Sequence, residues 1–242
     1  MKRSLLLNLA LTLLIVACSR AEGPALEPEV LIQGAIERMT STSGFHFIID
    51  RQGAPAFIDP AYSIALRRME GDYAAPDRVQ AVVRVISPGL ISNIEVISIG
   101  ETQWETNPIS GAWEQLPPEW GFNPALLFDN QIGFQLALQE DVSALVNLGL
   151  EELQEMPGQS LAVLGGELNG ARLHAMSFGI IADAPLQMKL WINPQTFELA
   201  RCQITEPLEE GEDEPTIWTM DFWNYDLSIE IHPPSGYETT TP

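Results

Sequence analysis

Residues 78–96 read RVQAVVRVISPGLISNIEV, and their pattern is the clearest indication of the fold. Every second residue from Val79 to Val85 is apolar, and the same alternation returns at Ile94 and Val96. Alternation with a period of two residues predicts strands that bury one face. Ser87-Pro88-Gly89 separates the two runs and is a turn signal. Because so short a turn joins only antiparallel neighbours, the stretch predicts an antiparallel hairpin.

The same alternation recurs on both sides of this hairpin. It appears in residues 45–50 and 186–192, and a last strand is predicted for residues 216–225. Asn169-Gly170 is the strongest further turn signal, because a type I′ turn needs positive φ at both central positions. The chain as a whole therefore predicts a meandering antiparallel sheet.

A helix is predicted before the first strand, over residues 28–43. Ile32, Ile36 and Met39 share one face of it, and Pro28 suits its first turn. The apolar periodicity ends at Ser43-Gly44, where the helix is expected to stop.

Two shorter helical segments are predicted in the middle of the meander, over residues 125–128 and 132–140. Helices inserted there must lie over one face of the sheet or cover its mouth. No internal repeat or composition break divides the chain, so residues 28–234 are predicted to form one domain. Residues 235–242 are expected to be a flexible polar tail.

The charge balance excludes whole classes of partner. Thirty-three Asp and Glu residues against 12 Lys and Arg residues give a net charge of −21. A protein of that sign is repelled by phosphate backbones, which argues against nucleic acid and against anionic lipid head groups held by a basic face. The apolar share of 45% is too high for a disordered acidic chain. We therefore expect a folded acidic protein that is localised by something other than positive charge.

The N-terminus supplies a candidate for that localisation. Residues 1–17 have the pattern of a signal peptide, because their apolar run is shorter than the ~20 residues that cross a bilayer as a helix. The run ends in Ile15-Val16-Ala17-Cys18, which resembles a bacterial lipobox. This predicts acylation of Cys18, against the alternative of an ordinary signal peptide with a chance cysteine. Residues 18–27 would then be a lipidated tether, and the protein would be exported and anchored to the outer face of the cell membrane.

Residues suited to enzymatic chemistry are sparse. His46, His174 and His232 have no spacing that places two of them on one helical face for a metal. His46 and His174 fall in strand-like runs, where an outward-facing or hydrogen-bonded histidine is favoured over a catalyst. No Gly-x-Ser-x-Gly motif and no phosphate-binding glycine-rich loop occurs in the sequence. We predict no catalytic residue and no metal ligand.

The acidic run over residues 206–214 has a simple interpretation. It lacks the ligand spacing and the closing Glu of an EF-hand loop, so a solvated hairpin loop is favoured over a Ca²⁺ site. Cys202 is the only cysteine besides Cys18, so no disulfide framework is expected.

Six tryptophans add to the apolar supply of the chain. Such side chains form cores, sugar-stacking platforms or the walls of lipid pockets. The apolar supply exceeds what one sheet with few helices buries easily. If the sheet is curved, its concave apolar face takes either a helix or a ligand.

Several short motifs together resemble one protein family. Residues 73–79, Tyr-Ala-Ala-Pro-Asp-Arg-Val, are similar to the strand-entry segment of the LppX/LprAFG envelope lipoproteins, which are related to the LolA-like lipoprotein carriers. Further segments match that family in order along the chain: Ile97-Ser98-Ile99-Gly100, Trp104-Glu105-Thr106, Gly111-Ala112-Trp113, Trp191-Ile192-Asn193-Pro194 with Arg201, and Trp218 to Asp226 with Pro233. The likeness covers nearly the whole chain after the tether, from about Leu31 to Pro233.

The resemblance implies an α+β fold, in which a strongly curved antiparallel half-barrel carries helices on or over its concave face. It also implies an apolar cavity that holds acyl chains, in a protein that is not an enzyme and needs no cofactor. The predicted cavity lining is Val79, Ala81, Val83, Val85, Ile94, Val96, Leu186, Met188 and Leu190. The predicted lid is Phe128, Ile132, Phe134 and Leu138.

The leading hypothesis is an envelope lipoprotein that binds the acyl chains of a lipid or glycolipid and carries or presents that lipid across the cell envelope. Its expected partners are the lipid, the membrane that holds its anchor, and a membrane transporter. The first alternative is a surface lipoprotein with a filled core, which binds glycans or another envelope protein through exposed tryptophans and acidic loops. The second is a structural domain whose cavity is fully packed.

Overall fold

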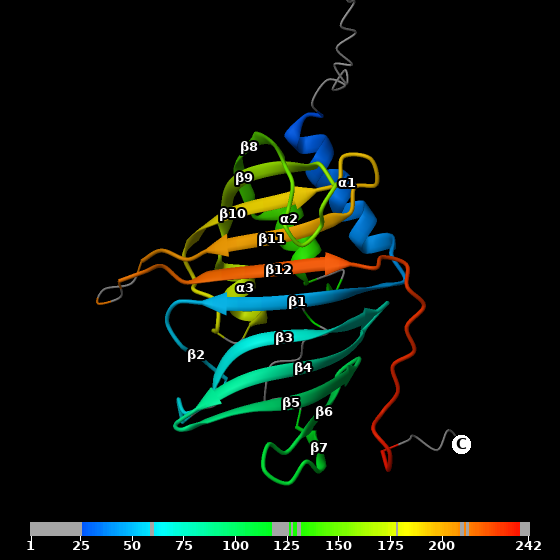
Figure 1. Ribbon diagram of the computed structural model, residues 1–242, viewed down its shortest axis with the longest axis vertical. Coiled ribbons are helices and arrows are strands. Elements are labelled where there is room, and N and C mark those ends of the chain that lie inside the picture. Colours follow the sequence, from blue (N-terminus) through cyan, green and yellow to red (C-terminus); the bar gives the residue numbers. More distant parts are fainter. Residues whose placement is uncertain are drawn as a thin grey trace, which may run out of the picture.

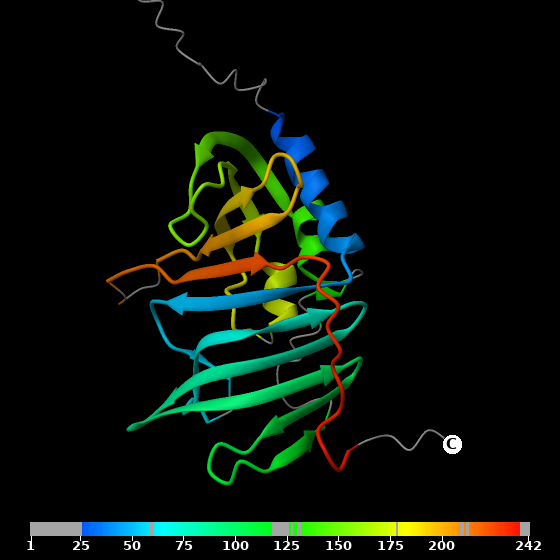
Figure 2. The same ribbon diagram turned by 45° about the vertical axis from the view of Figure 1, so that its right-hand side comes forward.

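In the computed structural model, the described residues form one antiparallel sheet and three helices (Figures 1 and 2). The structure describes residues 26–58, 61–117, 126, 128–129, 132–177, 179–208, 211 and 213–237. Its elements in chain order are α1 (Pro28–Ser41), β1 (Gly44–Gln52), β2 (Ala56–Phe57), β3 (Ala65–Ala74), β4 (Arg78–Ser87), β5 (Leu90–Ile99), β6 (Thr102–Thr106), β7 (Trp113–Leu116), α2 (Phe134–Glu140), β8 (Val142–Glu151), β9 (Leu161–Asn169), α3 (Ala171–Met176), β10 (Pro185–Ile192), β11 (Leu199–Thr205) and β12 (Ile217–Trp223). The predicted signal peptide, Cys18 and all of the tether up to residue 25 lie outside the described residues.

The strand order joins two meanders in the middle of the sheet. It runs β7-β6-β5-β4-β3-β1-β12-β11-β10-β9-β8, and β2 pairs with β3 off this path. The first long strand, β1, and the last strand, β12, are therefore neighbours at the centre, where His46 lies opposite Trp223. Because the path ends in β7 and β8, the sheet stays open with these two strands as its edges.

The predicted hairpin over residues 78–96 is confirmed. Strands β4 and β5 are joined at Pro88-Gly89, and Gly89 supplies the positive φ of 79° that this turn requires. In the register, Val83 lies opposite Ile94 and Ala81 lies opposite Val96. The alternating apolar side chains of the two strands therefore share one face.

Helix α1 begins and ends as its sequence predicts, within two residues. Pro28 is its first residue, Glu29 lies in the first turn and Arg38 in the last turn, which suits the helix dipole. Its buried residues are Leu31, Ile32, Ala35, Ile36 and Met39. Gly34 weakens the intrinsic helix propensity, but a Cβ there would lie 2.3 Å from the ring of Phe197, so the close packing of that ring needs a glycine.

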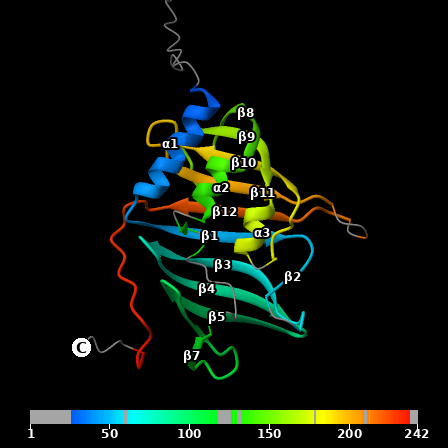
Figure 3. The same cartoon turned by 180° about the vertical axis from the view of Figure 1, so that it is seen from behind.

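All three helices lie on one face of the sheet, which Figure 3 shows from behind. We call this the inner face and the opposite one the outer face. Helix α1 contacts β8 and β10, and α2 contacts β8 and β9, so the helices cover mainly the β8–β10 side. The prediction of an α+β fold, with a curved, open antiparallel sheet and helices over its concave face, is confirmed.

The inner face is crowded where β3 and β4 pair. Gly71 lies opposite Ala81, and a Cβ on Gly71 would lie 2.2 Å from the carbonyl oxygen of Gln80 and 2.7 Å from Cα of Ala81. The obstructing atoms are backbone atoms, which cannot rotate away. Small residues on the inner side thus let the strands crowd together, as strong curvature requires.

Asn169-Gly170 is not a type I′ turn, and this prediction was wrong. Gly170 has a φ of −72° and precedes helix α3, which lies between β9 and β10. The glycine is needed for close packing instead, because a Cβ would lie 2.4 Å from the carbonyl oxygen of Ala182. Strands β9 and β10 are nevertheless antiparallel neighbours, as the meander predicts.

The predicted flexible tail is fixed at its beginning. The hydroxyl of Tyr237 donates a hydrogen bond to the carbonyl oxygen of Trp113 at 3.1 Å, and its ring lies 6.3 Å from that of Trp104. Residues 235–237 are therefore tied to β6 and β7, whereas residues 238–242 lie outside the described part of the chain.

Candidate functional site

The nine residues predicted to line a cavity lie together on the inner face. Their side chains come from β4, β5 and β10, and none is more than 6% exposed. All nine belong to one hydrophobic cluster that runs between the sheet and the helices. Strands on both sides of the central β1–β12 pair thus contribute to a single apolar layer.

Phe128 is the central residue of the predicted lid. Its ring centroid lies 5.1 Å from each of the rings of Phe45, Phe47 and Tyr73, and 6.4 Å from that of Phe222. It is 2% exposed. Burial raises the pKa of Tyr73 to about 12, so this phenol stays protonated and donates to the carbonyl oxygen of Pro76 at 2.9 Å.

The other lid residues divide into two groups. Phe134 and Leu138 lie on α2 and are 3% and 2% exposed, so they face the apolar layer. Ile132 precedes α2 and is 44% exposed, which differs from its predicted position in the lid. The amide of Ile132 donates to Oδ1 of Asp129 at 3.0 Å, which holds it in the turn before the helix rather than on its buried face.

Two of the three helices that cover the apolar layer are short. Helix α2 has seven residues and α3 has six, and neither has a side-chain cap at its N-terminus. Isolated helices of that length are unstable in water, so packing against the sheet must hold them in place. Such elements move more easily than the strands beneath them.

Two polar atoms in this region are buried without a partner among the described residues. They are Oγ of Ser98 and Oε1 of Gln135. Ser98 lies on β5, opposite the inward-facing Val79 of β4, and is fully buried. The other end of the Gln135 amide donates to the carbonyl oxygen of Phe128 at 3.3 Å. Buried polar groups are nearly always hydrogen-bonded, so each exception needs an explanation.

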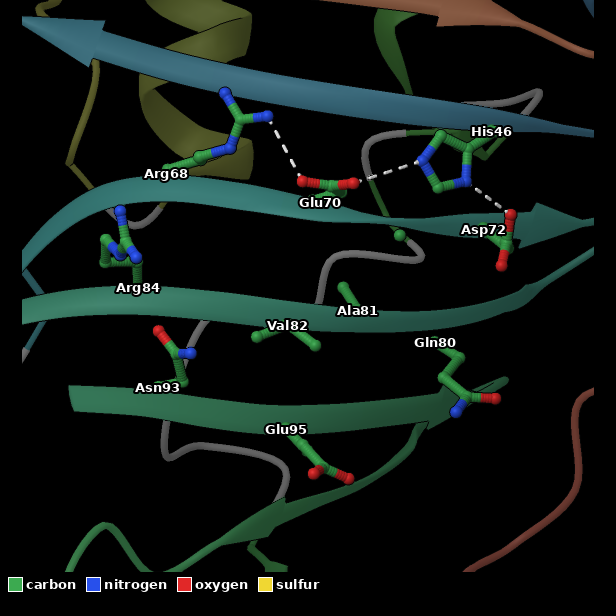
Figure 4. Close-up of a pocket in the computed structure, with 11 residues that line it drawn as sticks. His46, Arg68, Glu70, Asp72, Gln80, Ala81, Val82, Arg84, Asn93 and Glu95 are labelled. Carbon is green, nitrogen blue, oxygen red and sulfur yellow. Dashed lines mark hydrogen bonds and ion pairs between the residues drawn. The ribbon is translucent and has the colours of Figure 1, made fainter.

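The outer face has a different character. A groove of about 520 Å³ crosses β1, β3, β4 and β5, and Figure 4 shows its polar lining. Nδ1 of His46 lies 2.7 Å from Asp72, and Nε2 lies 3.7 Å from Glu70. Glu70 also pairs with Arg68, which in turn pairs with Asp50. These charges satisfy one another across neighbouring strands, so His46 is an outward-facing, hydrogen-bonded histidine.

The remaining candidates for chemistry have structural roles. His174 lies on helix α3, not in a strand as predicted, and its Nδ1 lies 2.8 Å from the carbonyl oxygen of Ile181. Glu206, the first residue of the acidic run, is 6% exposed and accepts a hydrogen bond from Nε1 of Trp218 at 2.5 Å. Among the described residues, no group of three potential ligands could hold a metal ion.

The tryptophans serve mainly as core residues. Trp104, Trp191 and Trp218 are buried, and Trp113 and Trp223 are partly buried. Trp120 lies outside the described residues. Trp113 and Trp223 are thus the described tryptophans that keep part of their surface exposed.

Comparison with known proteins agrees with this architecture. The sequence profile of the LppX_LprAFG lipoproteins matches residues 27–231. The crystal structure of LprF from Mycobacterium bovis superposes with a TM-score of 0.66 at 14% identity, covering 86% of this chain and 97% of that one. LppX from Mycobacterium tuberculosis, a lipoprotein, superposes with a TM-score of 0.56 at 14% identity, covering 85% of this chain and 100% of that one. At this level of identity the two structures show the shared fold alone.

A comparison with curated proteins finds no match. Within the described ranges, no helix is both long enough and apolar enough to span a membrane. The profile covers most of the chain and the two superposed structures share its fold, so the chain belongs to the LppX_LprAFG lipoprotein family.

Proposed function

We propose that this chain is an envelope lipoprotein that holds the acyl chains of a lipid or glycolipid between its inner sheet face and its helices, and carries or presents that lipid across the cell envelope. The observation that carries the proposal is the continuous apolar layer to which both sides of the sheet contribute. An acyl chain that enters this layer gains about 0.8 kcal/mol for each methylene it buries. That gain offsets the cost of leaving a bilayer.

The short helices support a route into the layer. Helices α2 and α3 depend on packing for their stability, so their displacement exposes the apolar face without breaking strand pairs. The hydroxyl of Ser98, which has no partner among the described residues, would then donate to an ester oxygen of the lipid, and Oε1 of Gln135 would accept from a lipid hydroxyl.

The location of the protein follows from its N-terminus. We infer that Cys18 is acylated and anchors the protein to the outer face of the cell membrane, because a net charge of −21 argues against attachment through basic residues. A membrane transporter is the partner that would supply or receive the lipid.

The lipid site is tested with a matched pair of substitutions on β4. Val83 faces the apolar layer and is 6% exposed, whereas its neighbour Val82 faces outward and is 43% exposed. In a Cys18→Ala chain, which cannot be acylated, we expect Val83→Trp to abolish uptake of a fluorescent phospholipid because the indole fills the inner face. Val82→Trp should leave uptake unchanged.

Native mass spectrometry of the same Cys18→Ala chain, purified from a membrane-containing host, should reveal co-purified lipid. The mass of the protein alone, without bound lipid, together with no uptake of the fluorescent lipid, would contradict the proposal. Equal uptake by the two tryptophan variants, with far-UV circular dichroism confirming that both are folded, would place the lipid elsewhere.

The anchor has its own test. Cys18→Ala should move the protein from the membrane fraction to the soluble fraction, because the acyl chains supply the membrane affinity. Retention of the variant in membranes would contradict acylation of Cys18 as the anchor.

A further inference from the structure

Strand β8 is an unusual edge strand. It forms one edge of the sheet, and only one of its ten residues, Glu151, is charged. Val146, Leu148 and Leu150 are 50%, 49% and 48% exposed. Edge strands of soluble proteins normally carry charged side chains that prevent association, so these apolar side chains need a partner.

The edge is not shaped to pair with another strand. Its register against β9 shifts between Ser143 and Val146 and again between Asn147 and Gly149. Gly149 has a φ of 101°, and Ala144 has a φ of 51°. Such bulges interrupt the row of unpaired backbone groups that an added strand would use. The partner must therefore accept apolar side chains without regular backbone pairing.

The same edge lies where the chain leads back to Cys18. Nδ2 of Asn147 donates to the carbonyl oxygen of Leu26 at 3.2 Å, and α1 contacts β8. Leu26 and Val30 at the start of α1 are themselves 37% and 48% exposed. Figure 1 shows β8 and the beginning of α1 at the same end of the molecule. Eight residue steps separate Cys18 from Leu26, and they span at most about 29 Å.

We propose that β8 and the first turn of α1 dock onto the bilayer that holds the lipid anchor, with Val146, Leu148 and Leu150 inserted among the lipid head groups and upper acyl chains. The proposal rests on the acylated Cys18 of the proposed function, because the tether keeps this end near the membrane. The charged residues nearest in sequence, Glu27, Glu29, Asp141 and Glu151, are all acidic. Lys189 lines a depression beside Val146 and Leu148, and Glu167 lines the same depression. The acidic excess suits zwitterionic rather than anionic lipids.

Docking here would also explain the position of the helices. Strand β8 contacts both α1 and α2, which border the apolar layer. The edge that touches the bilayer is therefore next to the elements that would open for an acyl chain.

A spin label tests the docking directly. The full chain, acylated at Cys18 and reconstituted in phosphatidylcholine vesicles, is labelled with a nitroxide at Leu148→Cys. Cys202 does not interfere, because it is fully buried and burial raises the pKa of its thiol far above the usual range. The matched control is Ile91→Cys, which is 65% exposed on β5, eight strand spacings of about 4.8 Å along the sheet from β8.

We expect the label at residue 148 to become more accessible to membrane-dissolved oxygen and less accessible to a water-soluble nickel complex when vesicles are present. The label at residue 91 should show no such shift. Vesicle flotation is measured on the same samples. A chain that floats while residue 148 stays accessible to nickel overturns the docking and leaves the anchor intact.

Two other outcomes also count against the proposal. A chain that does not float overturns the anchor, and with it the orientation from which docking is inferred. Dipolar coupling between labels at residue 148, in vesicles where nickel accessibility is unchanged, assigns the apolar edge to a second copy of the chain instead of the membrane.

Discussion

Arg38 fixes the end of helix α1 to the segment that follows the last strand. Its guanidinium donates to both carboxylate oxygens of Asp226, at 3.1 and 2.8 Å, and also to Glu198 at 2.9 Å. It lies 4.9 Å over the ring of Tyr225, and Thr42 donates to the same Asp226 carboxylate. One arginine thus connects the beginning and the end of the domain, 188 residues apart.

This contact predicts a specific pH dependence for Asp226→Asn. The hydrogen bonds from Arg38 hold the pKa of Asp226 below its ordinary value of 3.8. A lowered carboxyl pKa contributes stability that is complete above pH 3.8 and is lost as the pH falls through the lowered value. Urea denaturation should therefore give the wild-type chain a higher free energy of unfolding than Asp226→Asn at neutral pH. This difference in free energy should become smaller below about pH 4. A difference in free energy of unfolding that stays constant from pH 7 to pH 2 would contradict the lowered pKa of Asp226.

At the level of elements, helix α2 shows how a short helix is held against the sheet. It buries Phe134, Gln135, Ala137 and Leu138, which occupy one side of a helix. The sequence over 132–140 alternates apolar residues with a period closer to two, so no clean helical face could be read from it. Packing against the apolar layer, rather than intrinsic periodicity, selects the helix.

Phe128 and Ile132 form a matched pair for testing the lid. Phe128→Ala should lower the free energy of unfolding by about 3–5 kcal/mol, because it removes a ring packed among four others and leaves a cavity. Ile132→Ala should change it by less than about 0.5 kcal/mol, because that side chain is 44% exposed. Equilibrium urea denaturation measures both, and similar losses for the two variants would show that Phe128 is not a core residue.

At the scale of the whole molecule, stability is organised by position in the sheet and not by position in the chain. Strands β1 and β12 lie at the centre and pair on both sides, whereas β7 and β8 are edges. Central strands open only with the whole domain, and edges open locally.

Amide hydrogen exchange should therefore be slowest in β1 and β12, although they are the first and last long strands. Exchange should be fastest, among the strands, in β7 and β8. Mass spectrometry of peptic fragments resolves these segments. Protection that decreases steadily from one end of the chain to the other would contradict a single cooperative sheet.

Local patterns in the sequence predicted the first helix, the strands over residues 45–50, 78–96, 186–192 and 216–225, and the buried face of the central hairpin. The strands β3, β8 and β9 were not predicted. Alternation is a property of neighbouring residues, so the burial of Val79, Val83 and Leu190 could be predicted without knowing what covers them. The resemblance of short motifs to a family added the curvature and the helices over the concave face. The predicted lining and lid residues are buried except Ile132, and their role in lipid binding stays a prediction.

The order of the strands and the contacts between distant apolar residues could be seen only in the tertiary structure. Antiparallel alternation is compatible with many strand orders, so nothing local specifies that His46 pairs with Trp223 at the centre of the sheet. Gly170 was likewise predicted to be a hairpin residue, but it precedes helix α3, and the carbonyl groups of Ala182 and Ala184 leave no room for a Cβ there. The exposed apolar edge of β8 emerged in the same way, because exposure depends on what the rest of the chain leaves uncovered.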